Sequence, residues 1–390
     1  MIPTGSNHVR NVKISSNDSL VLCAKEESHF FDRKAIGVTG KSLQKHAVAF
    51  ANADGGEICV GIADDRQEPN PIKRWRGSES TEDFNGILQA LFEVQPTLAL
   101  TYEVLFSEGK TGYILRVSID KSPQVHKTAD GKVYQRYGAQ SLPVTDPQRI
   151  IDLSFAKGAS TFEDQPMAGI RPEALVESTE LKAFLQGYSP KTDPLDFAVN
   201  QHLLDNASWQ PICAGILLFH DNPSAVMPRK CAVKIARYET SEDDAERTHL
   251  RQQWTVEGPL YQLIHRTMHE ITEIMSSMNI WTPEGLKNVQ YPPEAIWEIV
   301  VNAIIHRDYS VSDDVQILIY NNRIEVLSPG RLPGYVNVDN ILDARYSRNP
   351  KIVRNLNRYS DPPNKDLGEG LNTAFQKMKE WKLRDPIIVE

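Results

Sequence analysis

Residues 292–309 read PPEAIWEIVVNAIIHRDY, and this stretch predicts a mostly buried helix. Two consecutive prolines suit a helix start, and apolar residues fill most of the turns that follow. Along this helix Glu298, Asn302 and His306 recur at every fourth position, so their side chains lie on one face. Polar groups on a buried face need partners. The face is therefore either a packing face with a hydrogen-bonded Asn or a binding site.

A nucleotide-bound Mg²⁺ with its water molecules would satisfy this polar face. A carboxylate such as Glu298 can orient a water molecule, and the side-chain oxygen of Asn302 can ligate a hard cation. The residues alone thus favour a site for a magnesium nucleotide over a helix-packing face.

The same stretch resembles a divergent GHKL-type ATP-binding module related to the C-terminus of RecG. The resemblance rests on E-x-x-x-N-A-x-x-H-R-D-Y, on IEVLSPG at 324–330 and on SRNP at 347–350. It implies that Glu298 activates water and that Asn302 binds Mg²⁺. Residues 367–371, LGEGL, resemble the second glycine box, where backbone and a helix N-terminus meet phosphates. The implied ATP site comprises Glu298, Asn302, His306, Asp308, Gly330, Gly368 and Gly370.

One box departs from the family pattern. Classical members recognise adenine through the Asp of a D-x-G-x-G box, whereas this chain has Ser328-Pro329-Gly330 at that place. The departure leaves both adenine selectivity and hydrolysis open.

Composition places the chain among ordinary globular proteins. Its 390 residues, 40% hydrophobic and 24% charged, suffice for two or three domains. No apolar run is long enough to cross a bilayer, and the first residues lack the apolar core of a signal peptide, so we expect a cytoplasmic protein. Four scattered cysteines argue against a zinc knuckle or a disulfide framework. The net charge of −8 argues against diffuse polyanion binding but allows a local basic patch.

Four segments are expected along the chain. Residues 1–157 alternate helix and strand patterns, and residues 158–172 have the polar composition of a linker. Residues 173–285 contain a buried-strand candidate, 214–219, and an amphipathic helix from 260 to 278. We interpret that helix as core packing, with subunit contact in a homo-oligomer as the alternative. Residues 286–390 hold the ATPase-like module.

The first segment resembles the Schlafen AlbA-type domain. The resemblance rests on Glu27-Ser28, on FDRK at 31–34, on AVAFANADGG at 47–56 and on GIADD at 61–65. It extends to VHKTADGKVYQRYGAQS at 125–141, where Asp130-Gly131 predicts a type I′ hairpin turn and Arg136 with Gly138 fits the family's R-x-G. Together the two resemblances cover most of the chain.

The resemblance to Schlafen endoribonucleases implies a catalytic role for the acidic residues of this segment. Glu27, Asp32 and Asp64 or Asp65 would bind Mg²⁺ or Mn²⁺ and activate water for phosphodiester attack, with Lys34 beside the scissile phosphate. Many bacterial relatives with these residues are regarded as DNA-binding regulators, so a binding or structural role is the default interpretation.

Basic and aromatic residues interleave in the first segment as in single-strand binding surfaces. A solvated loop explains the run at 73–76 nearly as well. The candidate nucleic-acid-binding residues are Lys34, Lys73, Arg74, Trp75, Arg76, Lys127 and Arg136.

The sequence thus predicts an α+β, multidomain protein with an AlbA-like domain, a middle α/β segment and a GHKL-like α/β sandwich. The expected function is DNA or RNA binding with an ATP-binding module, in transcriptional regulation or antiviral defence against phage. One alternative is a metal-dependent endoribonuclease switched by nucleotide. Another is an oligomeric scaffold with a vestigial ATP site. Whether the chain is an enzyme, as a nuclease or a weak ATPase, stays open at this stage.

Overall fold

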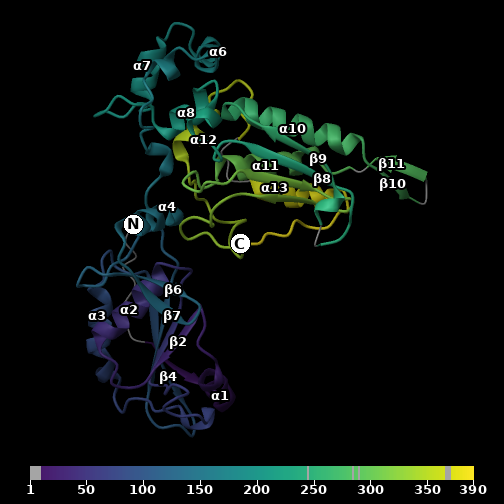
Figure 1. Cartoon of the computed structure of the whole chain (residues 1–390). Coiled ribbons are helices and arrows are strands. Elements are labelled where there is room, and N and C mark those ends of the chain that lie inside the picture. Colours follow the sequence, from purple (N-terminus) through teal and green to yellow (C-terminus); the bar gives the residue numbers. More distant parts are fainter. Residues whose placement is uncertain (1–9, 244–245, 283–284, 289, 365–369) are drawn as a thin grey trace. The chain divides into compact units, whose positions relative to one another are not determined.

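The structure is a computed structural model that describes residues 10–243, 246–282, 285–288, 290–364 and 370–390. It divides into two compact units (Figure 1). Unit 1 comprises residues up to Ala159 together with Pro333–Tyr335, and unit 2 comprises Ser160–Leu332 and Val336–Glu390. Several sheets and many helices in separate units confirm the predicted α+β, multidomain class. The expected segment boundaries within the chain stay predictions.

Unit 1 is built on a mixed five-stranded sheet with the strand order β1-β4-β5-β3-β2. β1 pairs parallel with β4 and β2 parallel with β3, while β5 runs antiparallel to both of its neighbours. A separate hairpin of β6 and β7 contacts α2. The elements are β1 (Arg10–Ile14), α1 (Ser16–Ala24), β2 (Phe31–Lys34), α2 (Gly40–Ala51), β3 (Gly56–Val60), η1 (Pro71–Lys73), η2 (Thr81–Phe84), α3 (Asn85–Phe92), β4 (Leu100–Ser107), β5 (Ile114–Ile119), β6 (Val133–Tyr137), β7 (Gln140–Val144) and α4 (Pro147–Lys157).

Helix α2 connects the parallel strands β2 and β3 and forms the centre of the unit's main core. Thr39 caps its N-terminus by accepting from the backbone N–H of Ser42. Beyond its C-terminus the chain turns into β3, and at Gly56, the first residue of β3, a Cβ would lie 2.5 Å from the Phe50 ring. The buried Asn52 side chain accepts from His126 N at 2.7 Å and donates to the carbonyls of His126 and Tyr134. Asn52 therefore joins α2 to the chain that leads into β6.

Unit 2 is built on a four-stranded sheet with the strand order β13-β12-β8-β9. β12 pairs parallel with β8, and the two outer pairs are antiparallel. The expected middle segment thus contributes β8 and β9 to the same sheet as β12 and β13. The elements are η3 (Phe162–Asp164), α5 (Glu173–Val176), α6 (Thr179–Tyr188), α7 (Pro194–Asn200), α8 (Cys213–Phe219), α9 (Pro223–Val226), β8 (Val233–Tyr238), η4 (Arg247–His249), β9 (Leu250–Val256), α10 (Leu260–Ser276), β10 (Asn279–Thr282), β11 (Gly285–Asn288), α11 (Pro293–Ile305), β12 (Val315–Ile319), β13 (Ile324–Leu327), α12 (Pro350–Leu356) and α13 (Gly370–Glu380).

The predicted helix at 292–309 is confirmed as α11, which ends before His306. The apolar face of α10 packs into the core of unit 2, as expected for that helix. None of the helices in the described ranges combines the length and apolar character that crossing a bilayer requires.

Two local predictions are wrong. Residues 214–219 lie in helix α8 rather than in a strand, because every residue of α8 is buried and a wholly apolar run fits either element. The hairpin of β6 and β7 turns at Gly138-Ala139 instead of Asp130-Gly131. Asp130-Gly131 forms an earlier, separate turn, closed by the bond from Gly131 N to the Thr128 carbonyl.

Glu163 in η3 caps a helix that lies almost 190 residues further along the chain. Its fully buried carboxylate accepts from Lys351 N at 2.9 Å and from Ile352 N at 3.0 Å, at the start of α12. Burial raises the pKa of this carboxyl to about 7, against the lowering effect of the two N–H groups. The region that the sequence suggested as a linker therefore carries a structural contact of unit 2.

The raised pKa of Glu163 predicts a pH-dependent stability difference between the wild type and Glu163→Gln. Below the pKa of the unfolded chain both states hold the proton, and as pH rises towards 7 the folded state loses stability relative to the variant. The difference approaches about 3 kcal/mol. Urea unfolding at pH 5 and pH 8, followed by tryptophan fluorescence, measures it, because five of the six tryptophans lie in unit 2. Glu173→Gln, at an exposed position of α5, is the control; parallel profiles for wild type and Glu163→Gln would contradict the assignment.

Candidate functional site

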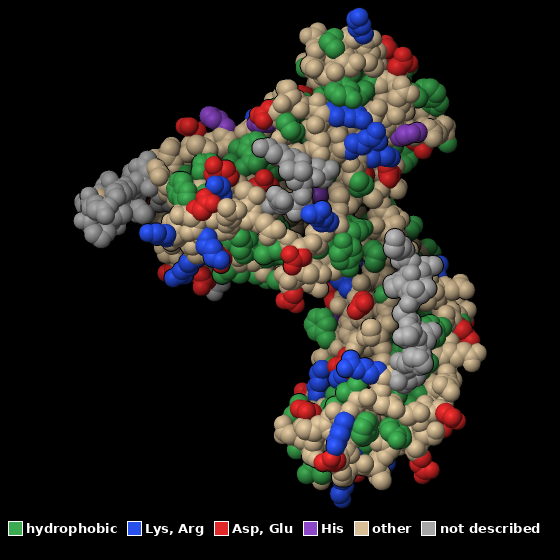
Figure 2. All heavy atoms as spheres, turned by 180° about the vertical axis from the view of Figure 1, so that it is seen from behind, with side chains coloured by type: hydrophobic (Ala, Val, Ile, Leu, Met, Phe, Trp, Pro, Cys, Tyr) green, Lys and Arg blue, Asp and Glu red, His purple; other side chains and the backbone are tan. Residues whose placement is uncertain are grey.

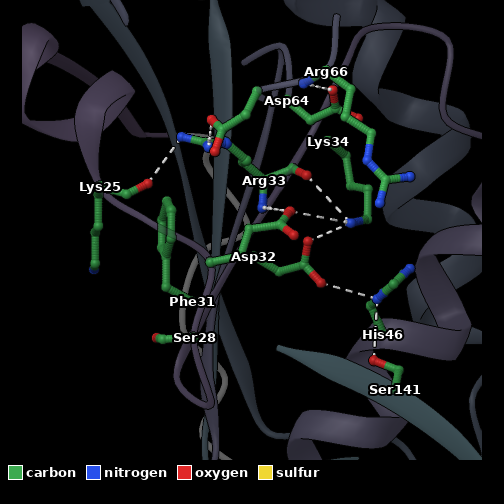
Figure 3. A network of polar contacts seen from close by, with 12 residues as sticks. Lys25, Ser28, Phe31, Asp32, Arg33, Lys34, His46, Asp64, Arg66 and Ser141 are labelled. Carbon is green, nitrogen blue, oxygen red and sulfur yellow. Dashed lines mark hydrogen bonds and ion pairs between the residues drawn. The ribbon is translucent and has the colours of Figure 1, made fainter. Parts of the chain in front are cut away.

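Asp32 is the centre of a buried polar network in unit 1 (Figure 3). Strand alternation places Asp32 and Lys34 on the same side of β2. The Asp32 carboxylate, 1% exposed, accepts from Arg136 Nη1 at 2.8 Å and lies 3.0 Å from His46 Nδ1, and it also accepts from Lys34 Nζ. Burial by itself raises the pKa of Asp32, but the hydrogen bonds and charges of His46 and Lys34 outweigh it and hold the pKa well below its usual value. Asp32 is therefore ionised.

Arg136 is an internal anchor of this network. Besides Asp32, its guanidinium donates to the carbonyl of Ser28 at 2.9 Å and of Phe31 at 3.2 Å, and it lies over the Phe50 ring at 4.6 Å. Its side chain is fully buried. We therefore withdraw Arg136 from the candidate nucleic-acid-binding residues, because its donors are committed to Asp32 and to the carbonyls of Ser28 and Phe31.

Glu27 and His46 lie beside Lys34 and Asp32. Lys34 Nζ is 3.7 Å from Glu27 Oε1, which also accepts from Arg33 N. Burial and the neighbouring Asp32 raise the pKa of Glu27. Burial lowers the pKa of His46 despite its contact with Asp32, and its Nδ1 also lies 3.1 Å from Ser141 Oγ. The network thus combines a fixed ammonium with a carboxyl whose pKa is raised and an imidazole whose pKa is lowered.

Asp64 and Asp65 are engaged in other contacts. Asp64 accepts from the backbone N–H groups of Arg66 at 2.9 Å and Gln67 at 2.8 Å, and so closes a turn. Asp65 pairs with the guanidinium groups of Arg33 and Arg74. Within the described ranges, no three His, Cys, Asp or Glu side chains are grouped to hold a metal ion. The expected metal cluster of Glu27, Asp32 and Asp64 or Asp65 is therefore not formed among these residues, because Asp32 is saturated by cations.

The run at 73–76 also contains anchors. Arg74 is buried and donates to the carbonyls of Glu68, Cys23 and Pro69, and buried Trp75 donates to the Gly112 carbonyl. These two residues are unavailable to a ligand in this structure. Three other candidates of unit 1, Lys73, Arg76 and Lys127, are exposed.

Two residues near Lys34 were missed by the sequence analysis as site residues, His46 and Arg66. In Figure 3 the Arg66 side chain extends from the Asp64 turn on the side of the network where Lys34 and His46 lie. Arg66 is exposed, and its guanidinium has no polar partner among the described residues. A single sequence gives no signal for either residue, because both depend on the packing of α2 and the turn against β2.

In unit 2, the N-terminus of α13 meets the polar face of α11. A Cβ at Gly370 would lie 2.5 Å from Glu298 Oε2 and 3.2 Å from Asn302 Nδ2. The backbone at Gly370 therefore approaches both side chains closely, and only glycine leaves this room. Gly368 lies outside the described residues.

His306, Asp308 and Gly330 lie in the supporting structure after α11. Asp308 accepts from Arg348 Nη1 and from Ser310 N, and a Cβ at Gly330 would overlap the Asp308 side chain. Burial, followed by the charge of Arg348, lowers the pKa of His306 to about 4, so the ring is neutral. The carboxylate of Asp308 is committed to Arg348, and the contact of these residues with a nucleotide stays a prediction.

Comparison with protein families agrees with both parts of the fold. Residues 25–145 match the family model described as "Schlafen, AlbA_2". Unit 1 carries a Schlafen AlbA_2 domain. Residues 312–390 match the model described as "Putative ATP-dependent DNA helicase recG C-terminal", so the chain joins this AlbA_2 domain to an ATPase-like RecG C-terminal domain. Both predicted resemblances are confirmed, and together they indicate a nucleic-acid-related protein with an ATPase-like domain. The second match begins after α11, and Glu298 and Asn302 lie outside it.

Among solved structures, the crystal structure of the DIP2311 protein from Corynebacterium diphtheriae is similar at 18% identity. The alignment covers 96% of this chain and 78% of that chain, with a TM-score of 0.43. Comparison with curated proteins gave no match.

Asp32→Asn is expected to destabilise the AlbA_2 domain by about 3 to 5 kcal/mol, because it leaves the buried Arg136 and the neighbouring Lys34 without their counter-ion. Hydrogen exchange measured by mass spectrometry will show faster exchange of the β2 and β6 amides. Asp120→Asn, at an exposed loop position, is the control. Unchanged protection in Asp32→Asn would show that the network does not hold β6 to β2.

Proposed function

We propose that the AlbA_2 domain binds nucleic acid phosphates through a surface formed by Lys34, His46 and Arg66, here called the Lys34 surface. The observation that carries the proposal is the fixed position of Lys34. Its ammonium is held by the buried Asp32, yet its side chain is 22% exposed. An oriented cation binds a phosphate with less loss of side-chain entropy than a mobile one.

The charges around Lys34 support this role. The Glu27 carboxylate lies 3.7 Å from Lys34 Nζ, and the exposed guanidinium of Arg66 adds a planar donor. Contacts to phosphates carry no sequence information by themselves. We therefore propose a regulator of transcription or a phage-defence component whose AlbA_2 domain contributes affinity, and whose sequence preference has another source.

RNA cleavage is the second candidate function, and the pKa directions of Glu27 and His46 favour it. A carboxyl with a raised pKa and a neutral imidazole beside a phosphate-binding lysine are the groups that general acid–base cleavage requires. A substitution of Asp32 cannot distinguish a binding role from a cleavage role, because it is expected to disturb the fold. Glu27→Gln is the suitable variant, since Glu27 is bonded only at the edge of the network.

We propose that Glu298, Asn302 and Gly370 form the phosphate end of a magnesium-nucleotide site in unit 2. When bound, Mg²⁺ would neutralise phosphate charge. Asn302 offers an amide oxygen to the ion, Glu298 offers a carboxylate that can orient a water molecule, and the N-terminus of α13 offers backbone N–H groups. The close approach at Gly370 supports this arrangement. Nucleotide binding at this site would then switch the activity of the whole chain.

The first test of the Lys34 surface is nucleic-acid binding by the full chain. Fluorescence anisotropy with single-stranded RNA, tRNA and duplex DNA is expected to show salt-sensitive binding that the double variant Lys34→Gln/Arg66→Gln weakens about tenfold or more. The double variant Arg10→Gln/Lys13→Gln, at exposed positions of β1, removes the same charge elsewhere on the unit and is the control.

The same samples, analysed on denaturing gels with Mg²⁺ or Mn²⁺ and with or without ATP, separate the two candidates. Binding without cutting supports the regulator. Cutting that Glu27→Gln abolishes would establish the nuclease instead. Absence of binding at low salt would refute both.

Isothermal titration calorimetry tests the nucleotide site. Asn302→Ala is expected to weaken Mg²⁺-dependent ATP binding by about 1 to 3 kcal/mol, the cost of one charge-assisted contact. Gly370→Ala is expected to weaken it as well while leaving the fold intact, because the added Cβ meets only side-chain ends, those of Glu298 and Asn302, which must shift away from the site. Asn200→Ala, an exposed residue of α7, is the control. Equal affinities for wild type and Asn302→Ala would rule out the assignment.

A further inference from the structure

Two arginines without acidic partners lie at the end of α12 in unit 2. Arg354 is exposed in the last turn of the helix, and Arg358 follows its C-terminus by two residues. Among the residues that the structure describes, Arg354 has no polar partner and Arg358 has no carboxylate partner. Figure 2 shows Lys and Arg side chains gathered over this part of unit 2, near α6, α7 and α12.

Arg358 is held in a fixed orientation by neutral groups. Its Nη1 donates to Gln201 Oε1 at 2.6 Å and to Asn355 Oδ1 at 3.1 Å. Its guanidinium lies over the Tyr188 ring at 5.5 Å, and that ring stacks on buried Phe184 at 5.3 Å. Both of these bonds use Nη1, so the rest of the planar fork stays available for a ligand. The orientation is set before any ligand arrives, which lowers the entropy cost of binding.

The two guanidinium groups also repel each other. Arg358 N donates to the Asn355 carbonyl at 3.1 Å, so the chain leaves α12 in a tight turn that keeps Arg358 within one turn of Arg354, and like charges this close are destabilising. Burial lowers the pKa of Arg358, Tyr188 opposes this, and the positive charge of Arg354 adds to the lowering, as expected for two cations close together. Among the described residues, neither arginine forms an ion pair with a carboxylate. An anion placed between the two groups would relieve it.

We propose that Arg354 and Arg358 bind the phosphodiester backbone of nucleic acid and give unit 2 a contact surface of its own. The inference rests on the proposed nucleic-acid binding by the chain, but it uses a different surface from the Lys34 surface. Closely spaced phosphates can engage both groups at once, and the planar guanidinium fork matches phosphate oxygens. Because Arg358 already covers the Tyr188 ring, the contact is electrostatic and independent of sequence.

The test is the salt dependence of binding by the full chain. Affinity for single-stranded RNA and duplex DNA is measured by anisotropy between 50 and 200 mM salt for the wild type, Arg354→Gln/Arg358→Gln and Arg247→Gln/Arg251→Gln. The last variant removes two exposed arginines elsewhere in unit 2 and is the matched control for net charge. Loss of two phosphate contacts is expected to reduce the slope of log K against log salt by about 1.4 for single strands and about 1.8 for duplex DNA.

The outcomes show whether the inference fails alone or together with the proposed function. A reduced slope and about tenfold weaker binding in Arg354→Gln/Arg358→Gln alone support the inference. A slope equal to that of the wild type overturns it and leaves the Lys34 surface standing. No binding by the wild type overturns both. Arg354→Lys/Arg358→Lys keeps the charges, so it should retain the slope; if it loses the slope equally, the arginines act through the fold rather than through phosphates.

Competition with poly-glutamate tests whether the two arginines instead bind acidic protein segments. An acidic polypeptide that displaces RNA from the wild type but not from Arg354→Gln/Arg358→Gln, at concentrations comparable to RNA itself, would show a docking site for acidic protein segments and overturn the nucleic-acid assignment. Competition at such concentrations is not expected if the two arginines bind phosphodiesters.

Discussion

The AlbA_2 domain depends on the burial of one charge, the carboxylate of Asp32. A carboxylate removed from water is tolerated only when cations and hydrogen bonds compensate it. His46 and Lys34 hold the pKa of Asp32 low, and Arg136 donates to the same carboxylate and, through the carbonyls of Ser28 and Phe31, fixes the chain that enters β2. Asn52 joins the segment before β6 to α2 in the same way. These contacts fix the positions of β2, α2 and β6 relative to one another. Because Asp32 is fixed by them, the Lys34 ammonium bonded to Asp32 is held in place as well.

In unit 2 the residues that looked most like ligands also connect the fold. Asp308 binds Arg348, and Asn349 donates to the carbonyls of Ile305 and Arg307 at the end of α11. The motifs at 306–309 and 347–350 are therefore partners of each other. The family motif therefore contains two kinds of residue. Some hold the end of α11 in place, whereas Glu298 and Asn302 lie on its polar face, which α13 approaches.

Periodicity predicted the elements that have one polar and one apolar face, such as α10 and α11. It failed for α8, because a completely buried helix shows no alternation that would distinguish it from a strand. The site was predicted in part: Asp32, Lys34 and Glu27 do lie together, whereas Arg74, Trp75 and Arg136 are internal. Residue type shows that an arginine can bind a phosphate or a backbone carbonyl, but only the fold shows which of the two is within reach. His46 and Arg66 reach the network through tertiary packing, which a single sequence does not encode locally.

The parallel pairing of β8 with β12 has a consequence for the order of folding during synthesis. Val233 is opposite Val315, so the central pair of this sheet cannot form until more than 80 further residues have left the ribosome. Glu163 can bind the N-terminus of α12 only after even more residues have been translated. The sheet of unit 1, by contrast, is complete by Ile119. The AlbA_2 domain can therefore fold while unit 2 is still being translated, and unit 2 exposes the apolar surfaces of α8 and β8 for longer. Chaperone dependence and aggregation during expression should accordingly arise in unit 2 rather than in the AlbA_2 domain.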